Sequence, residues 1–197
     1  KTGLIVPLGN WVIDEACRQL SEWRAQGNIG WSVAVNLSTL QFEQPSLVQT
    51  IMDSLQKHEV PPDTLILEVT ETTAMTNPDE SVRVLTELTD AGVQASIDDF
   101  GTGYSSLLYL KRLPACELKI DRAFVRELNS DGDDATIVSA IIALAKTLNL
   151  KVVAEGVETT EQQAFWTELG CNTLQGYLLG RPVTPEVISA QGNTLCQ

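Results

Sequence analysis

The chain has 197 residues, 43% of them apolar, and a formal net charge of −13 at pH 7. This length and apolar content predict one domain with a sizeable buried core. The negative charge argues against binding a nucleic-acid polymer, because a groove for a polyanion needs clustered lysine and arginine.

The cysteine and histidine residues argue against several kinds of functional site. Cys17, Cys116, Cys171 and Cys196 form no Cys-x-x-Cys pair, which is typical of reduced thiols in a cytosolic protein. His58 is the only histidine and is expected at the surface, which argues against a histidine-rich zinc site and a Ser-His-Asp triad.

Because no apolar run reaches a length of about 18 residues, we expect a cytoplasmic segment without direct membrane contact. It can still be the cytoplasmic part of a membrane-anchored protein.

Strand and helix patterns alternate from the start of the chain. Asn10 is expected to cap a first helix that ends at Gly27. A short strand over residues 32–36 follows, and Pro45 is expected to open the second helix. The apolar stripe of the first helix is expected to comprise Val12, Ala16, Leu20 and Trp23.

The same alternation continues to the end of the chain. Asn77 and Pro78 provide an N-cap and a first-turn proline for a helix that Gly92 ends. Six strands alternating with helices predict βα units and a parallel sheet. The later strands are expected at 64–70, 93–97, 117–120, 151–154 and 173–175. The later helices are expected at 105–112, 133–149, 159–169 and 185–190.

Metal-capable or charged side chains occur at the carboxyl end of every predicted strand. Asp98 and Asp99 directly follow an apolar strand, and two neighbouring carboxylates resist burial unless a positive charge accompanies them. Taken alone, the pair is consistent with either a divalent metal site or a solvated turn. In parallel α/β barrels, active sites lie at this face. The other strand ends carry Asn36, Glu68, Glu71, Lys119, Asp121, Glu155, Glu158 and Gln175.

The oxygen ligands at these strand ends suit Mg²⁺ or Mn²⁺ better than a thiolate-bound metal. Asn36, Glu68 and Asp98 could hold one ion. Asp99 could reach a second, since neighbouring residues at a strand end can point to different sides. Two ions about 4 Å apart would clamp a phosphodiester and acidify a bridging water.

The remaining charged residues have both catalytic and structural interpretations. Lys119 could stabilise charge on phosphoryl oxygens and Glu155 could accept a proton from water. A structural ion pair is the alternative for each of them. Glu71 and Glu158 lie just outside the strands, where capping a helix or anchoring a loop is as reasonable as catalysis.

Six motifs resemble the EAL-domain family of cyclic di-GMP phosphodiesterases, along essentially the whole chain. The resemblance implies a modified TIM-type (β/α)8 barrel that linearises cyclic di-GMP to pGpG with Mg²⁺ or Mn²⁺. The motifs are Val35-Asn-Leu-Ser38, Leu67-Glu-Val-Thr-Glu71, Asp98-Asp-Phe-Gly-Thr-Gly-Tyr-Ser-Ser106, Leu118-Lys-Ile-Asp121, Val153-Ala-Glu-Gly-Val-Glu158 and Gln175-Gly-Tyr177.

The resemblance also implies roles for single residues. Asn36, Glu68 and Asp98 match metal ligands, and Asp99 matches a ligand of a second metal. Lys119 matches a lysine that contacts phosphate and the attacking water, and Glu155 matches the general base. Glu71 matches a glutamate that holds the loop after Asp98-Asp99, which the family uses for metal binding and dimerisation, so a homodimer is expected. Glu158 and Gln175 are similar to supporting residues of the site, as is Asp121.

The Glu-Ala-Leu motif that names the family does not occur in these 197 residues. The resemblance places that motif before Lys1, on a strand that supplies a further metal-ligating glutamate and a nearby arginine for phosphate. Residues 1–197 are therefore expected to form an N-terminally incomplete EAL domain that lacks about the first two strands. An incomplete sequence, a shortened chain and a partner that supplies the missing wall are the three explanations.

Two functions follow. The first is a metal-dependent cyclic di-GMP phosphodiesterase, behind a sensory or diguanylate-cyclase domain upstream. The second is a module that binds cyclic di-GMP or a protein without hydrolysis. The segment by itself is expected to be inactive or nearly so, because one metal ligand and the arginine are missing.

Overall fold

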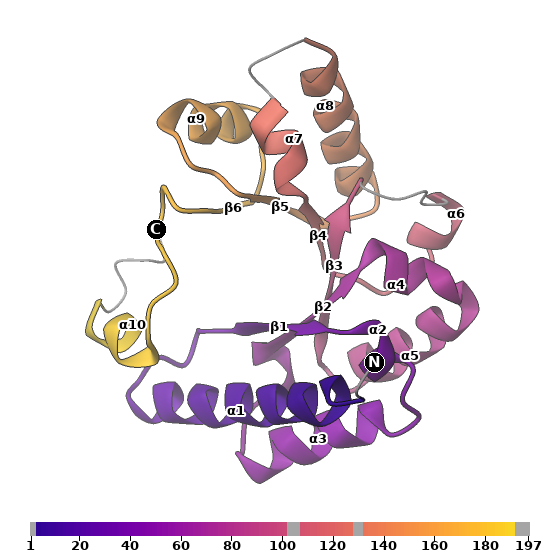
Figure 1. Cartoon of the computed structure of the whole chain (residues 1–197), viewed down its shortest axis with the longest axis vertical. Coiled ribbons are helices and arrows are strands. Elements are labelled where there is room, and N and C mark those ends of the chain that lie inside the picture. Colours follow the sequence, from indigo (N-terminus) through magenta and orange to yellow (C-terminus); the bar gives the residue numbers. More distant parts are fainter. Residues whose placement is uncertain (1–2, 102–106, 128–131, 192–197) are drawn as a thin grey trace.

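The computed structural model describes residues 3–101, 107–127 and 132–191. Within these residues, six parallel strands form one curled sheet in chain order, β1 to β6, with helices around its convex side (Figure 1). This α/β half-barrel confirms the predicted parallel sheet and the barrel-type fold class. The strands are β1 (Val33–Leu37), β2 (Leu65–Thr70), β3 (Gln94–Phe100), β4 (Glu117–Ile120), β5 (Lys151–Glu155) and β6 (Thr173–Gln175).

The helices mostly connect successive strands. None of those in the described ranges is both long and apolar enough to cross a bilayer. They are α1 (Ile5–Ala25), α2 (Thr39–Phe42), α3 (Leu47–Lys57), the 3-10 turn η1 (Pro62–Thr64), α4 (Glu71–Thr76), α5 (Pro78–Asp90), α6 (Leu107–Leu110), α7 (Arg122–Glu127), α8 (Gly132–Thr147), α9 (Thr160–Glu168) and α10 (Pro185–Gln191).

Burial differs between the middle and the edge of the sheet. Most residues of β2 and β3 are buried, because these strands have neighbours on both sides and helices behind them. In β1, which pairs only with β2 among the described strands, Val35 and Leu37 are buried whereas Ala34 and Asn36 are exposed. Asn36 therefore lies on an edge strand.

The first helix departs from its prediction. It begins at Ile5, so Asn10 lies inside the helix and the predicted N-cap is wrong. The helix can start earlier because Pro7 falls in the first turn, where backbone N–H groups lack intrahelical partners. The buried stripe is also shifted by one position at its start. It comprises Gly9, Ile13, Cys17, Leu20 and Trp23.

The glycine and proline signals placed other boundaries correctly. α5 begins at Pro78, and Gly92 follows its end with a φ of 95°. The N–H of Val93 bonds to the carbonyl of Leu88, and the N–H of Gly92 bonds to that of Thr89, which closes the last turn. α1 likewise ends before Gly27, also at a φ of 95°.

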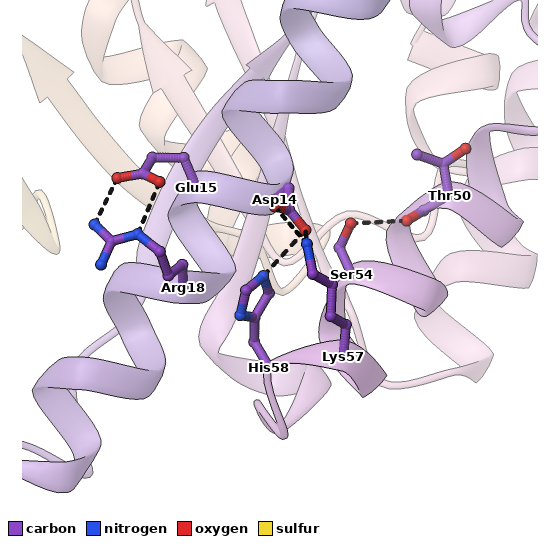
Figure 2. Close-up of polar contacts among 7 residues, drawn as sticks. All are labelled: Asp14, Glu15, Arg18, Thr50, Ser54, Lys57 and His58. Carbon is purple, nitrogen blue, oxygen red and sulfur yellow. Dashed lines mark hydrogen bonds and ion pairs between the residues drawn. The ribbon is translucent and has the colours of Figure 1, made fainter.

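A polar cluster joins α1 to α3, as Figure 2 shows. Asp14 accepts hydrogen bonds from Lys57 Nζ at 2.8 and 2.9 Å, and His58 Nε2 lies 3.0 Å from its Oδ1. The His58 side chain is only 15% exposed, so the expected surface histidine is instead part of this interhelical contact. The hydrogen bond from Lys57, and then that from His58, lower the pKa of the Asp14 carboxyl against the opposing effect of burial.

We expect Asp14→Asn to destabilise the protein by at most about 1 kcal/mol at pH 7, because the cluster is partly exposed. Since the folded-state pKa of Asp14 is depressed, its contribution is present above the unfolded value of about 3.9 and is lost as the pH falls below it. Urea unfolding at pH 7 and pH 3 measures this difference. Asp63→Asn, at an exposed carboxylate, is the matched control. The prediction would be contradicted if the free energy of unfolding of Asp14→Asn differed from that of wild type by the same amount at pH 7 and pH 3.

Candidate functional site

A bulge in β3 places both adjacent aspartates at the site. Ile97 pairs with Leu118 and Phe100 pairs with Ile120, so Asp98 and Asp99 together face a single residue of β4. Asp99 has a φ of 54°, in the left-handed region that few residues other than glycine adopt. Bulges of this kind redirect a side chain and occur next to active sites.

The bulge changes the expected arrangement of the pair. In a regular strand, adjacent side chains point to opposite faces. Here one carboxylate oxygen each from Asp98, Asp99 and Glu155 lie within 4.8 Å of one another. The pair lies within β3 and not after it, and each aspartate contributes a carboxylate oxygen to this cluster.

Lys119 is the positive centre of this cluster. It is the residue of β4 opposite the bulge, and it is 4% exposed. Its Nζ lies 2.6 Å from Glu68 Oε1, 2.6 Å from Glu155 Oε1 and 3.4 Å from Asp98 Oδ1. Burial acts to lower the pKa of Lys119, but the bonds to Glu155 and Glu68 outweigh it and raise the pKa above its ordinary value. The lysine is therefore charged at neutral pH.

One lysine does not compensate all of these carboxylates. Burial raises the pKa of Glu155, and the ion pair with Lys119 offsets this only in part. Burial, the neighbouring Asp98 and then Asp121 raise the pKa of Asp99. Burial is the largest cause at both residues, and a further cation at the site would oppose these rises.

The predicted ligand Asn36 and the predicted supporting residue Asp121 lie beside the cluster. Asn36 is the register partner of Glu68 across β1 and β2, and register partners point to the same face of a sheet. Asp121 follows β4 and accepts a hydrogen bond from the N–H of Ala123 at 2.8 Å. Asp121 also contributes to the raised pKa of Asp99, after burial and Asp98.

Glu71 lies beside the chain that leaves β3. It is 2% exposed, and its Oε2 accepts a hydrogen bond from the N–H of Gly101 at 2.7 Å. Residues 102–106 of the Asp98–Ser106 motif lie outside the described residues. The bond places Glu71 where the resemblance expects an anchor, and a role in activity stays a prediction.

A hollow of about 240 Å³ opens beside Glu155. Glu158 and Gln175 line it, so these two predicted supporting residues border the site without belonging to the buried cluster. Arg122, the first residue of α7, also lines it, and our sequence reasoning missed this cation. Its position directly after Leu118-Lys-Ile-Asp121 was the available signal. The full lining is Arg122, Glu155, Gly156, Glu158, Gln175, Gly176 and Tyr177.

The cluster fits a hard divalent cation by its donor chemistry. Its ligand atoms are carboxylate oxygens with the Asn36 amide nearby, and Mg²⁺ and Mn²⁺ prefer such ligands. One carboxylate oxygen each from Asp98, Asp99 and Glu155 lie close enough together to hold a metal ion.

Comparison with known proteins identifies the family. The sequence model of the EAL domain family matches residues 1–182 of this chain. The chain belongs to the EAL domain family. This confirms the resemblance on which the residue assignments rest.

Two relatives and two solved structures show how this EAL domain compares. It is 62% identical to the Pseudomonas aeruginosa bifunctional diguanylate cyclase/cyclic di-GMP phosphodiesterase MucR over 190 residues, which are 96% of this chain and 28% of MucR. It is 39% identical to the Escherichia coli cyclic di-GMP phosphodiesterase PdeR, over 93% of this chain and 28% of PdeR. The EAL domain thus spans less than a third of the curated relatives it matches.

The solved structures support the same fold. This EAL domain aligns with a cyclic di-GMP complex of the MucR phosphodiesterase at a TM-score of 0.93 and 61% identity, over 95% of this chain and 76% of that one. It aligns with a manganese and cyclic di-GMP complex of Klebsiella pneumoniae BlrP1 at a TM-score of 0.72 and 37% identity, over 78% of this chain and 40% of that one. The six-stranded half-barrel is therefore part of a known barrel architecture.

Proposed function

We propose that this EAL domain hydrolyses cyclic di-GMP to linear pGpG in bacterial second-messenger signalling. The observation that carries the proposal is the buried Lys119, which joins Glu68, Asp98 and Glu155 where the strands end. The phosphodiesterase names of MucR and PdeR and the cyclic di-GMP complex of MucR support it.

Different residues of the cluster have different roles in the hydrolysis of one phosphodiester bond. Glu155 accepts a proton from the attacking water, and its raised pKa makes it a better base near neutral pH than an ordinary glutamate. Lys119 stabilises the negative charge that develops on the phosphoryl oxygens. Its ion pairs with Glu68 and Glu155 hold the ammonium in place before substrate arrives.

Mg²⁺ or Mn²⁺, in a two-metal site, is part of the proposal. Asn36, Glu68 and Asp98 would hold one ion, and Asp99 would contribute to the second. Bound there, the metal would supply Lewis-acid polarisation of the phosphate and acidify the attacking water. The manganese complex of BlrP1 supports this choice of metal. Arg122 lines the hollow beside Glu155 and is suited to contact a substrate phosphate.

Turnover by the full-length protein that contains this chain tests the proposal. We expect pGpG to form from cyclic di-GMP with Mg²⁺ or Mn²⁺ and to stop when the metal is chelated, as followed by chromatography of the nucleotides. Tight binding of cyclic di-GMP in calorimetry without product would favour the alternative, a non-hydrolysing sensor. Neither binding nor product would favour a protein-interaction module.

The exposed edge of β1 supports a proposal about the domain as a whole. We infer that residues 1–197 are an incomplete barrel, and that further strands pair beside β1 and bring the missing glutamate and arginine. The isolated segment is then expected to be inactive or nearly so.

The partial coverage of MucR and PdeR supports an additional sensory or diguanylate-cyclase domain in the natural protein. The thiols of Cys17, Cys116 and Cys171, none of them in a disulfide, suit the cytoplasm.

A homodimer is the proposed assembly. Leu107 and Leu108, on α6 just beyond the segment that follows Asp98-Asp99, are 56% and 69% exposed. Adjacent exposed leucines are suited to a protein contact. Sedimentation velocity should show a dimer that Leu108→Glu converts to monomer, with Leu179→Glu as a control at another exposed leucine. A monomeric wild type at high concentration would contradict the proposal.

A further inference from the structure

The corner that follows β1 depends on side-chain contacts beyond the sheet. The pairing of β1 with β2 ends at Leu37 and Val69, and β1 has no second neighbour among the described strands. The next residues turn into the four-residue helix α2, whose N-cap is Ser38. Because the pairing of β1 with β2 stops at Leu37, contacts at this corner influence where the end of β1 lies.

Thr73 in α4 makes such a contact. The residue is 4% exposed, and its Oγ1 lies 2.7 Å from Oγ1 of Thr39, the first residue of α2. The Thr70 hydroxyl donates to the same Thr73 oxygen at 2.9 Å. Since Thr73 accepts from Thr70, its own hydroxyl hydrogen is available to donate to Thr39. The hydroxyls of Thr70, Thr73 and Thr39 thus form a hydrogen-bonded chain from the end of β2 to the corner after β1.

The same short helix also contacts the chain that leaves β3. Glu71, the first residue of α4, accepts the hydrogen bond from the N–H of Gly101. α4 therefore contacts the corner after β1 through Thr73 and the end of β3 through Glu71. The strand ends joined in this way are those that carry Asn36, Glu68 and the two aspartates.

We propose that Thr73 is a positioning residue that holds the end of β1, and with it Asn36, at the distance from Glu68 and Asp98 that metal binding requires. The proposal rests on the proposed function, because it takes Asn36 as a metal ligand. Thr73 itself touches neither metal nor substrate. The physical reason is that the buried Thr73 hydroxyl ties the exposed Thr39 to α4. Without it the Thr39 hydroxyl bonds to water, and the Thr70 hydroxyl loses its partner in α4.

Hydrogen exchange of the full-length protein tests the restraint without metal or substrate. We expect Thr73→Val to speed amide exchange over residues 38–43 by about fivefold to tenfold, the change expected when one hydrogen bond is lost. Thr73→Ser keeps the hydroxyl and should exchange like wild type. Thr39→Val removes only the bond between Thr39 and Thr73 and should speed exchange at the same corner, whereas Thr73→Val also removes the bond from Thr70. The double variant should add little to Thr73→Val, because the bond to Thr39 is already absent there. Unchanged exchange at this corner, or a uniform rise across the whole protein, would overturn the proposal.

Metal affinity provides the second readout. Thermal shift against added Mn²⁺, without nucleotide, should show the midpoint concentration raised by about fivefold in Thr73→Val and unchanged in Thr73→Ser. In turnover we expect a lower kcat at low Mn²⁺, restored at high Mn²⁺, with little change in KM. An unchanged Mn²⁺ midpoint in Thr73→Val would overturn the proposal. A wild type that hydrolyses nothing would contradict the proposed function, whereas the exchange rates and Mn²⁺ midpoints would still decide the role of Thr73.

Discussion

Glu155→Gln is expected to lower kcat for cyclic di-GMP hydrolysis by about 10²–10⁴-fold, the range that general-base catalysis contributes. Glutamine has nearly the shape of glutamate but cannot accept the proton from water. The fold should persist, because Lys119 keeps its ion pairs with Glu68 and Asp98. KM should change much less than kcat, since the loss falls on the chemical step.

Single-turnover formation of pGpG measures this effect, and circular dichroism with thermal unfolding checks the fold. Glu168→Gln, at an exposed glutamate of α9, makes the same chemical change away from the site and should keep wild-type turnover. Turnover by Glu155→Gln within a few-fold of wild type would remove Glu155 as the base. Its ion pair with Lys119 would then be only structural.

Lys119→Met is expected to destabilise the metal-free protein by about 3–5 kcal/mol at pH 7. The substitution removes the cation between Glu68, Asp98 and Glu155 and leaves buried carboxylates that repel one another. Burial already raises the pKa of Glu155, and the substitution removes the bond to Lys119 that offsets part of this rise. A carboxyl with a raised folded-state pKa favours folding less as the pH rises, so the deficit relative to wild type should shrink as the pH falls from 7 to 5.

Urea unfolding at the two pH values, without metal, measures the deficit. Lys151→Met is the matched control, because Lys151 is exposed at the start of the neighbouring strand β5 and should change stability by no more than about 0.5 kcal/mol. Added Mn²⁺ should recover more stability in Lys119→Met than in wild type, since the ion replaces the missing charge. Equal stability of Lys119→Met and wild type at pH 7 would show that the cluster does not depend on the lysine.

Local sequence patterns were sufficient for most of the fold. Period-two and buried apolar runs identified all six strands of the described residues. Pro78, Gly27 and Gly92 placed helix boundaries, because their backbone preferences act locally. Local patterns did not predict the start of α1 or the short helix α4. Asn10 is a good N-cap by type, but the helix begins at Ile5, with Pro7 in its first turn. The short helix α4 has no apolar period to reveal it, and Thr70 caps it.

For the site, the sequence by itself determined which residues stand at the strand ends, because parallel strands bring their carboxyl ends to one edge. Only the tertiary structure decided how those side chains meet. The bulge that turns Asp98 and Asp99 toward one cluster exists only in the register between β3 and β4. The position of Lys119 among carboxylates from three other strands likewise depends on the curl of the sheet. Register and curvature arise from packing between segments distant in the chain, and no local pattern encodes them.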